Sequence, residues 1–427
     1  MSPQILFYII FAIVIFGFIL DQILDYKNFK WFSKPVPNIL SDVYDAEKYQ
    51  KQQQYHIDNY RFGTISSGLS FLLICIVLIF NGFAFVNRIV LQITDSSILQ
   101  TLLFFGICYA ATLVISIPFG IYDTFVIEKK YGFNTTTIKT FITDFIKSLL
   151  LNAIISGGLL ALIVYIFMLT STWFWLLAWI LITAFSLFMG IFYSSLIVPL
   201  FNKQTPLEEG ELKNAIMSFA KKVGFNISNI FVIDGSKRST KANAYFTGLG
   251  KRKRIVLYDT LIKEMSVDEI VAVLAHEIGH YKHKHIYKSM FFGIIQMGIM
   301  LAIFGYFVSN DFLSAALGVE KATFHIALIT FTIIYSPISE ILGIFSNRSS
   351  RKNEYQADNF AKQHELAVPL ISALKKLSSH NMSNLTPHPW MVFFEYSHPP
   401  LLERIENLVE EYDIVMYNDS YVAIVET

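Results

Sequence analysis

Seven long runs with few or no charged residues constrain the fold of this chain most. They extend approximately over residues 4–20, 63–86, 98–122, 148–169, 173–200, 289–308 and 324–345. A hydrocarbon layer of about 30 Å is crossed by roughly 20 helical residues, so each run approaches or exceeds that length. Backbone inside a bilayer must satisfy its own hydrogen bonds, which predicts helices. We therefore expect a mainly α, polytopic membrane protein with seven transmembrane helices.

Composition supports this prediction. The chain is 54% hydrophobic and 16% charged, whereas soluble proteins are about a quarter charged. The net charge of +1 gives no support for a nucleic-acid partner. Both cysteines, Cys75 and Cys108, lie in apolar runs and are not predicted to bind metal. The first run lacks a basic leader and a cleavage site, and Asp21 follows it, so we expect a retained span rather than a signal peptide.

A short polar motif lies just before the sixth run, with the sequence His276-Glu277-Ile278-Gly279-His280. Residues four apart share one face of a helix, so the two imidazoles can bind a single zinc ion. Glu277 then lies beside the metal, where it can take a proton from a water molecule. The motif predicts the site of a metalloprotease that uses one zinc ion.

A catalytic zinc usually has three protein ligands, and geometry indicates where the third lies. The sixth run begins nine residues after His280, and Glu354 lies nine residues beyond the seventh run. If these runs form an antiparallel hairpin whose helices continue beyond the bilayer, Glu354 reaches the height of His280. Glu354 and Asp358 share one face, and we predict Glu354 as ligand and Asp358 as the hydrogen-bond partner of a ligand imidazole. Spacing alone leaves that order open. His283 and His285 are expected to continue the motif helix as a solvated face.

Two regions lie outside the membrane, one between the fifth and sixth spans and one after the seventh. They divide the chain into segments 1–201, 202–285, 286–346 and 347–427. Segment 202–285 is predicted to hold a helix over 209–223, strands near 230–233, 242–249 and 254–258, and the motif helix. Gly248 and Gly250 indicate a hairpin between the last two strands. Segment 347–427 is predicted to hold a helix around Glu354, another over 369–379, a loop with His388 and His398, and a helix from about residue 400.

Lysine and arginine are distributed unequally among the connections. The first and third connections are rich in them, whereas the second has only Arg88 and the sixth only Lys321. The positive-inside rule places the basic side, which includes the zinc motif, in the cytoplasm. The last six residues contain neither a dilysine nor a luminal retrieval signal. That favours a bacterial inner membrane over the endoplasmic reticulum without excluding either.

The chain resembles the type I CAAX prenyl endopeptidases, integral-membrane zinc metalloproteases that process farnesylated proteins. Besides the zinc motif, five segments match family sequences in order: 124–134, 199–203, 243–248, 351–358 and 397–404. One departure is that residues 351–353 read Arg-Lys-Asn, where relatives tend to have a second arginine and an aromatic residue. No predicted ligand lies at these positions.

The resemblance implies seven helices around a water-filled chamber, with a small α+β zinc-metalloprotease domain on the cytoplasmic side. By matching positions it makes His276, His280 and Glu354 the zinc ligands and Glu277 the general base. It also implies that His398 and Arg404 stabilise the oxyanion of the tetrahedral intermediate. An edge strand would pair with the substrate backbone. This strand comprises Asn243, Ala244, Tyr245 and Phe246.

Several functions remain open at this point. The partners expected are a peptide or protein substrate and membrane lipid, but no nucleic acid, and the oligomeric state is undetermined. The substrate is either a prenylated CAAX protein or a membrane or secretory protein undergoing quality control. A zinc transporter or sensor would need ligands at mid-bilayer, where Glu340 is the only ionisable candidate. An intramembrane site-two protease is disfavoured because Lys282, Lys284 and Lys288 crowd the motif helix.

Overall fold

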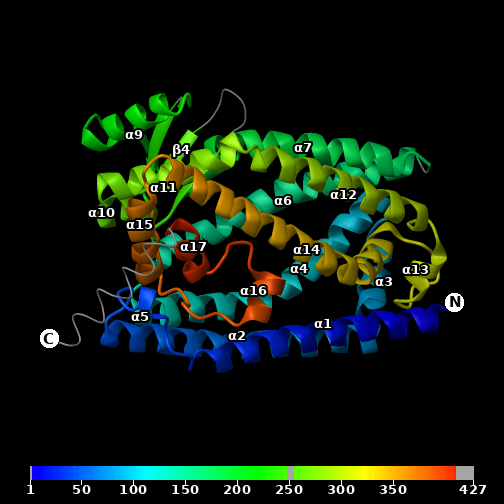
Figure 1. Cartoon of the computed structure of the whole chain (residues 1–427). Helices are drawn as coiled ribbons and strands as arrows, with labels where there is room; N and C mark the ends of the chain where they lie inside the picture. Colours follow the sequence, from blue (N-terminus) through cyan, green and yellow to red (C-terminus); the bar gives the residue numbers. More distant parts are fainter. Residues whose placement is uncertain (1, 171, 228, 248–253, 410–427) are drawn as a thin grey trace.

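The computed structural model describes residues 2–170, 172–227, 229–247 and 254–409 (Figure 1). Within these ranges, seven helices are long and apolar enough to cross a membrane, as predicted. They are α1 (Pro3–Trp31), α2 (Ala46–Ile79), α4 (Ser97–Tyr122), α6 (Ile138–Leu169), α7 (Phe174–Leu196), α12 (His285–Phe307) and α14 (Phe324–Gln363).

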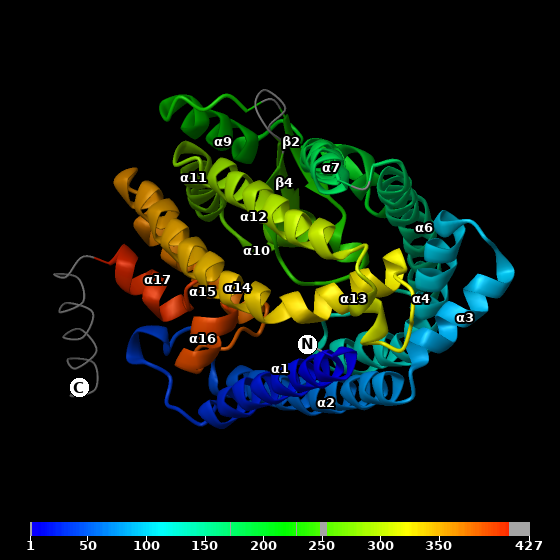
Figure 2. The same ribbon diagram turned by 90° about the vertical axis from the view of Figure 1, so that its right-hand side faces the viewer.

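The long helices form a closed ring (Figure 2). Helix α1 packs on α2, and the short helix α3 (Gly82–Ile93) connects α2 to α4. Contacts then continue through α6, α7 and α12 to α14, which returns to α1. The predicted architecture, a mainly α ring of seven membrane helices, is confirmed.

Helix α14 is the longest element and carries the seventh run beyond the bilayer. Its 40 residues span about 60 Å at about 1.5 Å per residue, roughly twice the thickness of the hydrocarbon layer. The separate helix expected around Glu354 is the continuation of this same helix. It continues because no glycine or proline interrupts residues 344–363.

The second predicted run does not form one straight helix. Helix α2 ends at Ile79, and α3 begins at Gly82. Asn81 between them adopts a left-handed conformation with φ of 52°, which asparagine tolerates better than most residues. A Cβ on Gly82 would lie 3.0 Å from Cγ1 of Val77, so a glycine suits this turn. The prediction of one span over 63–86 was therefore wrong at its end.

A small four-stranded sheet lies at the other end of the molecule from the N-terminus (Figure 1). The strands lie in the order β1 (Gln204–Pro206), β2 (Asn229–Ile233), β4 (Arg254–Tyr258) and β3 (Ala244–Thr247). Strands β2 and β4 are parallel, and the outer pairs are antiparallel. The three predicted strands are confirmed, whereas the three-residue β1 was not predicted. Gly248 and Gly250 of the predicted hairpin lie outside the described residues.

Shorter helices complete the described fold. Helix α16 was not predicted, since its seven residues give too short a pattern to recognise. The remaining elements are η1 (Asn38–Leu40), η2 (Asp123–Glu128), α5 (Lys129–Tyr131), α8 (Val198–Phe201), α9 (Glu211–Lys222), η3 (Gly235–Lys237), α10 (Asp259–Glu264), α11 (Val267–Lys282), α13 (Asp311–Ala315), α15 (Ala367–His380), α16 (Pro389–Glu395) and α17 (Leu401–Leu408).

Helix α11, which carries the zinc motif, is fixed at its N-terminus. Ser266 and Glu269 form a capping box, which satisfies two backbone N–H groups at the start of the helix. The same Glu269 carboxylate accepts hydrogen bonds from Ser372 Oγ at 2.6 Å and Lys376 Nζ at 2.8 Å, both on α15. The apolar face of α11 packs in a core with α9, α15 and the sheet. The motif helix is thus attached at one end and buried along its length.

Replacing Glu269 with glutamine tests this attachment. Burial raises the pKa of Glu269, but hydrogen bonds from Lys376, Ser372 and the Ser266 N–H outweigh burial and lower it. A lowered pKa stabilises the fold above the pKa of the unfolded carboxyl, and this contribution is lost as pH falls through the folded pKa. We expect Glu269→Gln to lower the free energy of unfolding at pH 7 by about 1–3 kcal/mol.

Thermal unfolding of the purified protein in detergent measures this effect. The exposed neighbour Asp268 on the same turn provides the control variant Asp268→Asn. The Glu269 variant should unfold at lower temperature than the control at pH 7, and the two should converge as the pH falls through the lowered pKa of Glu269. Equal unfolding temperatures at pH 7 would contradict the account.

Candidate metal and active site

Close packing of α11 against α14 brings the predicted ligands together. A Cβ on Gly279 would lie 3.0 Å from both Cα of Ala357 and Cβ of Phe360. Only glycine permits this approach without moving one of the helices. The glycine inside the zinc motif therefore determines how near α14 lies to the two histidines.

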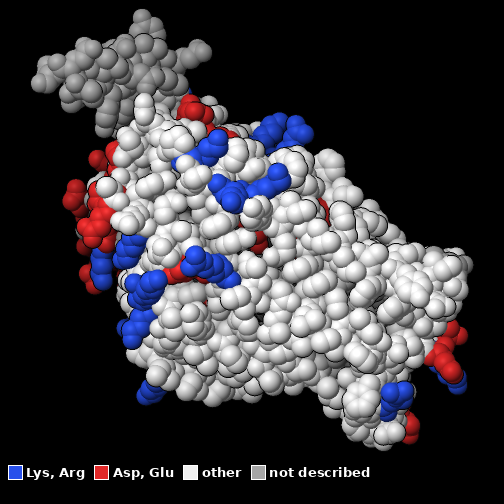
Figure 3. All heavy atoms as spheres, turned by 90° about the horizontal axis from the view of Figure 1, so that it is seen from below, with Lys and Arg blue, Asp and Glu red and all other residues white. Residues whose placement is uncertain are grey.

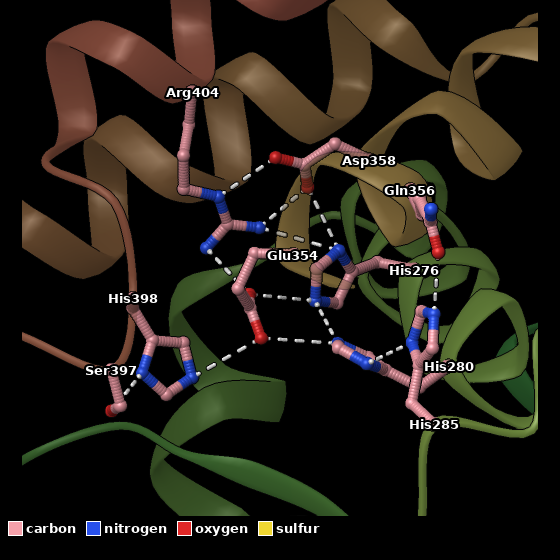
Figure 4. A network of polar contacts seen from close by, with 9 residues as sticks. All are labelled: His276, His280, His285, Glu354, Gln356, Asp358, Ser397, His398 and Arg404. Atoms are coloured by element: carbon pink, nitrogen blue, oxygen red, sulfur yellow. Dashed lines mark hydrogen bonds and ion pairs between the residues drawn. The ribbon is translucent and has the colours of Figure 1, made fainter. Parts of the chain in front are cut away.

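Three side chains converge at this contact (Figure 4). The Nε2 atoms of His276 and His280 lie 3.1 Å apart. Glu354 Oε2 lies 3.4 Å from Nε2 of His276, and its Oε1 lies 3.2 Å from Nε2 of His280. The helical hairpin expected from the sequence thus brings Glu354 to the predicted place.

The arrangement fits a zinc ion. Ligand atoms at about 2.0–2.1 Å from a tetrahedral metal lie roughly 3.4 Å apart, close to the spacing of these three groups. Glu354 Oε2 is buried and has no hydrogen-bond partner in the described chain, and a metal cation would satisfy it. Two imidazole nitrogens and a carboxylate also form the donor set of many catalytic zinc sites.

A buried ion-pair network supports His276. Its Nδ1 donates to Asp358 Oδ1 at 2.8 Å. Arg404 on α17 binds both oxygens of that carboxylate, at 2.9 Å from Nε and 2.6 Å from Nη2. Burial lowers the pKa of His276, but the hydrogen bond with Asp358 and the adjacent Glu354 carboxylate outweigh it and raise the pKa to about 9. Carboxylates that favour a proton here also favour a metal cation.

His285 is the site residue that the sequence prediction placed wrongly. Helix α11 ends at Lys282, and Lys284 adopts a left-handed conformation with φ of 59°. The chain turns there, and His285 begins α12 with only 3% of its surface exposed. No pattern in the sequence indicated this turn, because a lysine rarely adopts such a conformation. His283 is exposed, as expected.

The inward turn gives His280 a hydrogen-bond partner. The Nδ1 atoms of His280 and His285 lie 3.0 Å apart, and His285 Nε2 lies 2.8 Å from Gln356 Oε1 on α14. With Nε2 of His280 facing the metal site, its Nδ1–H donates to His285, whose Nε2–H donates to Gln356. Each ligand histidine therefore has a different partner: a carboxylate for His276 and a neutral imidazole for His280.

Glu277 lies on the side of α11 that faces the sheet. It is half-buried and lines a narrow pocket together with Ala244, Tyr245 and Phe246. The last three belong to β3, which pairs with β4 alone and forms the edge of the described sheet. Asn243 precedes the strand, and its carbonyl accepts a hydrogen bond from the Tyr258 N–H. Three of the four residues predicted for an edge strand therefore lie in β3, at the edge of the described sheet.

His398 lies on the side of Glu354 that faces away from His276 and His280 (Figure 4). Its Nε2 lies 3.4 Å from Glu354 Oε1, and its Nδ1 lies 2.9 Å from Ser397 Oγ. The side chain is 65% exposed. Arg404 instead lies behind the ligands, with its Nη1 3.7 Å from Glu354 Oε2 and its other nitrogens on Asp358.

Known proteins resemble this chain in sequence. The family model described as CAAX prenyl protease N-terminal, five membrane helices, matches residues 25–203, and that of peptidase family M48 matches residues 206–412. The chain belongs to peptidase family M48. The CAAX prenyl protease 1 homolog of Oryza sativa is 36% identical over 93% of this chain and 96% of its own. CAAX prenyl protease 1 of Saccharomyces cerevisiae is 34% identical over 93% of both chains.

The fold is shared as well. The crystal structure of S. mikatae Ste24p superposes with a TM-score of 0.88 at 33% sequence identity, covering 95% of this chain and 99% of that one. The family predicted from the sequence is confirmed, and so is its class, a multi-pass membrane metallopeptidase. The transporter and sensor hypotheses are set aside.

Removing the His285 imidazole tests its contact with His280. We expect His285→Ala to weaken zinc binding by about 10- to 100-fold, because the second ligand loses the partner that fixes its tautomer and orientation. His283→Ala is the matched control, since it removes an exposed imidazole two residues away. Competition between the purified protein and a fluorescent zinc chelator measures the affinity. Equal affinities for the two variants would contradict the assignment.

Proposed function

We propose that this chain is a zinc endopeptidase that cleaves the C-terminal CAAX segment of prenylated proteins. The convergence of His276, His280 and Glu354 beside β3, an edge strand of the described sheet, is the observation that supports it most. The relatives that match over most of this chain carry the name CAAX prenyl protease 1. The distribution of basic residues among the connections supports a site on the cytoplasmic face.

The zinc ion would be held by His276, His280 and Glu354. When bound, zinc polarises the scissile carbonyl and lowers the pKa of the attacking water. Glu277 accepts the proton of that water and later delivers it to the leaving amine. Because Glu277 lies on the same side of α11 as β3, it faces the place where a peptide paired with the strand would lie.

His398 is the residue that we assign to the developing oxyanion. Its exposed ring reaches Glu354 from the open side, where a substrate carbonyl can also approach. A donor held there before the reaction stabilises the transition state without reorganising during it. Arg404 acts through Asp358, since its guanidinium is occupied by that carboxylate. We therefore assign Arg404 to positioning His276 rather than to the oxyanion.

Strand β3 supports recognition of an extended peptide. A peptide that adds to a sheet edge is bound through its backbone, so many side-chain sequences are accepted. This mode suits the variable residues of a CAAX segment. It also favours the second candidate function, broad proteolysis of membrane or secretory proteins, which would not require a prenyl group.

The variant Glu277→Gln tests the general base. It keeps the size and the polar character of the side chain but cannot accept the proton. We expect zinc content to remain near one ion per chain, whereas peptide cleavage falls by about 100-fold or more. Zinc is measured by elemental analysis and cleavage with a quenched fluorescent peptide. Wild-type turnover in this variant would show that another residue is the base.

A pair of matched peptides decides between the two substrate classes. We expect a farnesylated CAAX peptide to be cleaved with a kcat/KM at least about tenfold above that of the same peptide without the lipid, because apolar contact adds binding energy. A farnesylated peptide that is blocked at the scissile amide serves as the control for detergent effects. It should compete with the farnesylated substrate for the enzyme. Equal kcat/KM values would favour broad proteolysis instead.

A further inference from the structure

A groove on the outer surface of the ring has no role in the proposed reaction. It lies between α2 and the end of α4 and continues to α5, with a volume of about 570 Å³. Apolar and aromatic side chains form its walls, and two cationic side chains lie at its end. The main lining residues are Phe62, Ile65, Phe119, Tyr122, Arg61 and Lys130.

The groove faces away from the interior of the protein. On the inner side of α2, Gln52 and His56 bond to the carbonyls of Ser383 and Met382. The opposite side carries exposed apolar residues spaced three or four apart, which form one stripe of the helix. The stripe comprises Ile65, Leu69, Leu72, Ile76 and Ile79. A wholly apolar, exposed stripe on a transmembrane helix contacts lipid.

Charged residues begin where this stripe ends. Asp58 and Arg61 continue its spacing toward the end of the molecule that holds the metal site. On the face seen from below, charged side chains lie at both ends of the molecule, with more at the end that holds the metal site, and the surface between the two ends has few (Figure 3). The groove therefore lies at the boundary between the hydrocarbon layer and the headgroups.

The two cations of the groove differ in their partners. Lys130 Nζ pairs with Asp58 Oδ2 at 2.6 Å, and the Tyr131 hydroxyl donates to the same oxygen. Arg61 is exposed, and its guanidinium makes no hydrogen bond or ion pair with the described part of the chain. Its charge is available to a ligand, and the three charges Arg61, Lys130 and Asp58 sum to a positive value.

The backbone beside the groove is irregular. Pro118 on α4 has no N–H to donate, and it lines the groove. The π-helical segment η2 follows at Asp123. Such segments are rare, have hydrogen bonds between residues i and i+5 instead of i and i+4, and often occur at functional sites. Because of Pro118 and η2, the end of α4 is not a regular α-helix where it lines the groove.

We propose that this groove binds a phospholipid with an anionic headgroup. The phosphate contacts Arg61, with Lys130 beside it, because guanidinium groups bind phosphate oxygens through two parallel hydrogen bonds. One acyl chain lies along Phe62, Ile65 and Phe119 and continues down the apolar stripe. Tyr122 lies at headgroup depth, where tyrosine is enriched in membrane proteins.

Native mass spectrometry of the full-length chain in detergent tests the site, with phosphatidylglycerol and phosphatidylcholine as probes. Arg61→Gln should weaken retention of phosphatidylglycerol by about fivefold, the loss expected for one basic residue near an anionic surface. Arg61→Lys should retain most of the binding. Arg88→Gln is the matched control, because it removes an exposed arginine from α3; it should bind as the wild type does.

Two further arms separate the possible ligands. Ile65→Trp fills the groove without changing its charge and should also reduce retention of phosphatidylglycerol. This variant tests the site by itself if Arg61→Gln fails to fold. Inorganic phosphate at millimolar concentration should not displace the lipid. The proposal is overturned if Arg61→Gln and Arg88→Gln retain phosphatidylglycerol equally, if Ile65→Trp binds normally, or if phosphate alone competes. Equal retention of phosphatidylcholine would also overturn it.

Discussion

The contact between α11 and α14 at Gly279 is the constraint on which the site depends. The two helices approach so closely that Ala357 lies where a side chain at position 279 would be. Only at this separation can Glu354 reach the imidazoles on the neighbouring helix. Because α14 is also a member of the membrane ring, the same contact joins the site to the transmembrane part of the protein. A change that separates the two helices therefore affects both the site and the transmembrane part.

Burying charged groups at this contact costs free energy that only complete pairing offsets. Asp358 is fully buried and is paired with both His276 and Arg404. The α17 segment that supplies Arg404 also follows the loop that carries His398, so the C-terminal region closes the site from one side. On the other side, His285 and Gln356 hold His280 through neutral hydrogen bonds. Each ligand is thus oriented by a different part of the chain.

The membrane helices and the two histidine ligands could be predicted from the sequence because they follow from periodicity and spacing. The seven apolar runs predicted the membrane helices, and the i and i+4 histidines predicted two ligands on one helix face. The distances of His280 and Glu354 from their spans predicted that a carboxylate near residue 354 would reach the histidines, and the family resemblance identified Glu354 as the ligand. Two features depend on single backbone conformations that leave no such pattern. Asn81 and Lys284 both adopt left-handed conformations, and they end α2 early and turn His285 inward. The pairing of Arg404 with Asp358 also required the tertiary structure, because α17 follows a loop whose path the sequence does not indicate.

The central claim is that two imidazoles and one carboxylate bind the same zinc ion. X-ray absorption spectroscopy at the zinc edge on the purified protein tests it most directly, in the wild type and with Glu354 replaced by alanine. The wild type should contain one zinc ion with two imidazole nitrogens and carboxylate or water oxygens at about 2.0–2.2 Å. The variant should lose an oxygen ligand or the metal itself. An unchanged spectrum and full zinc content in the variant would contradict the account.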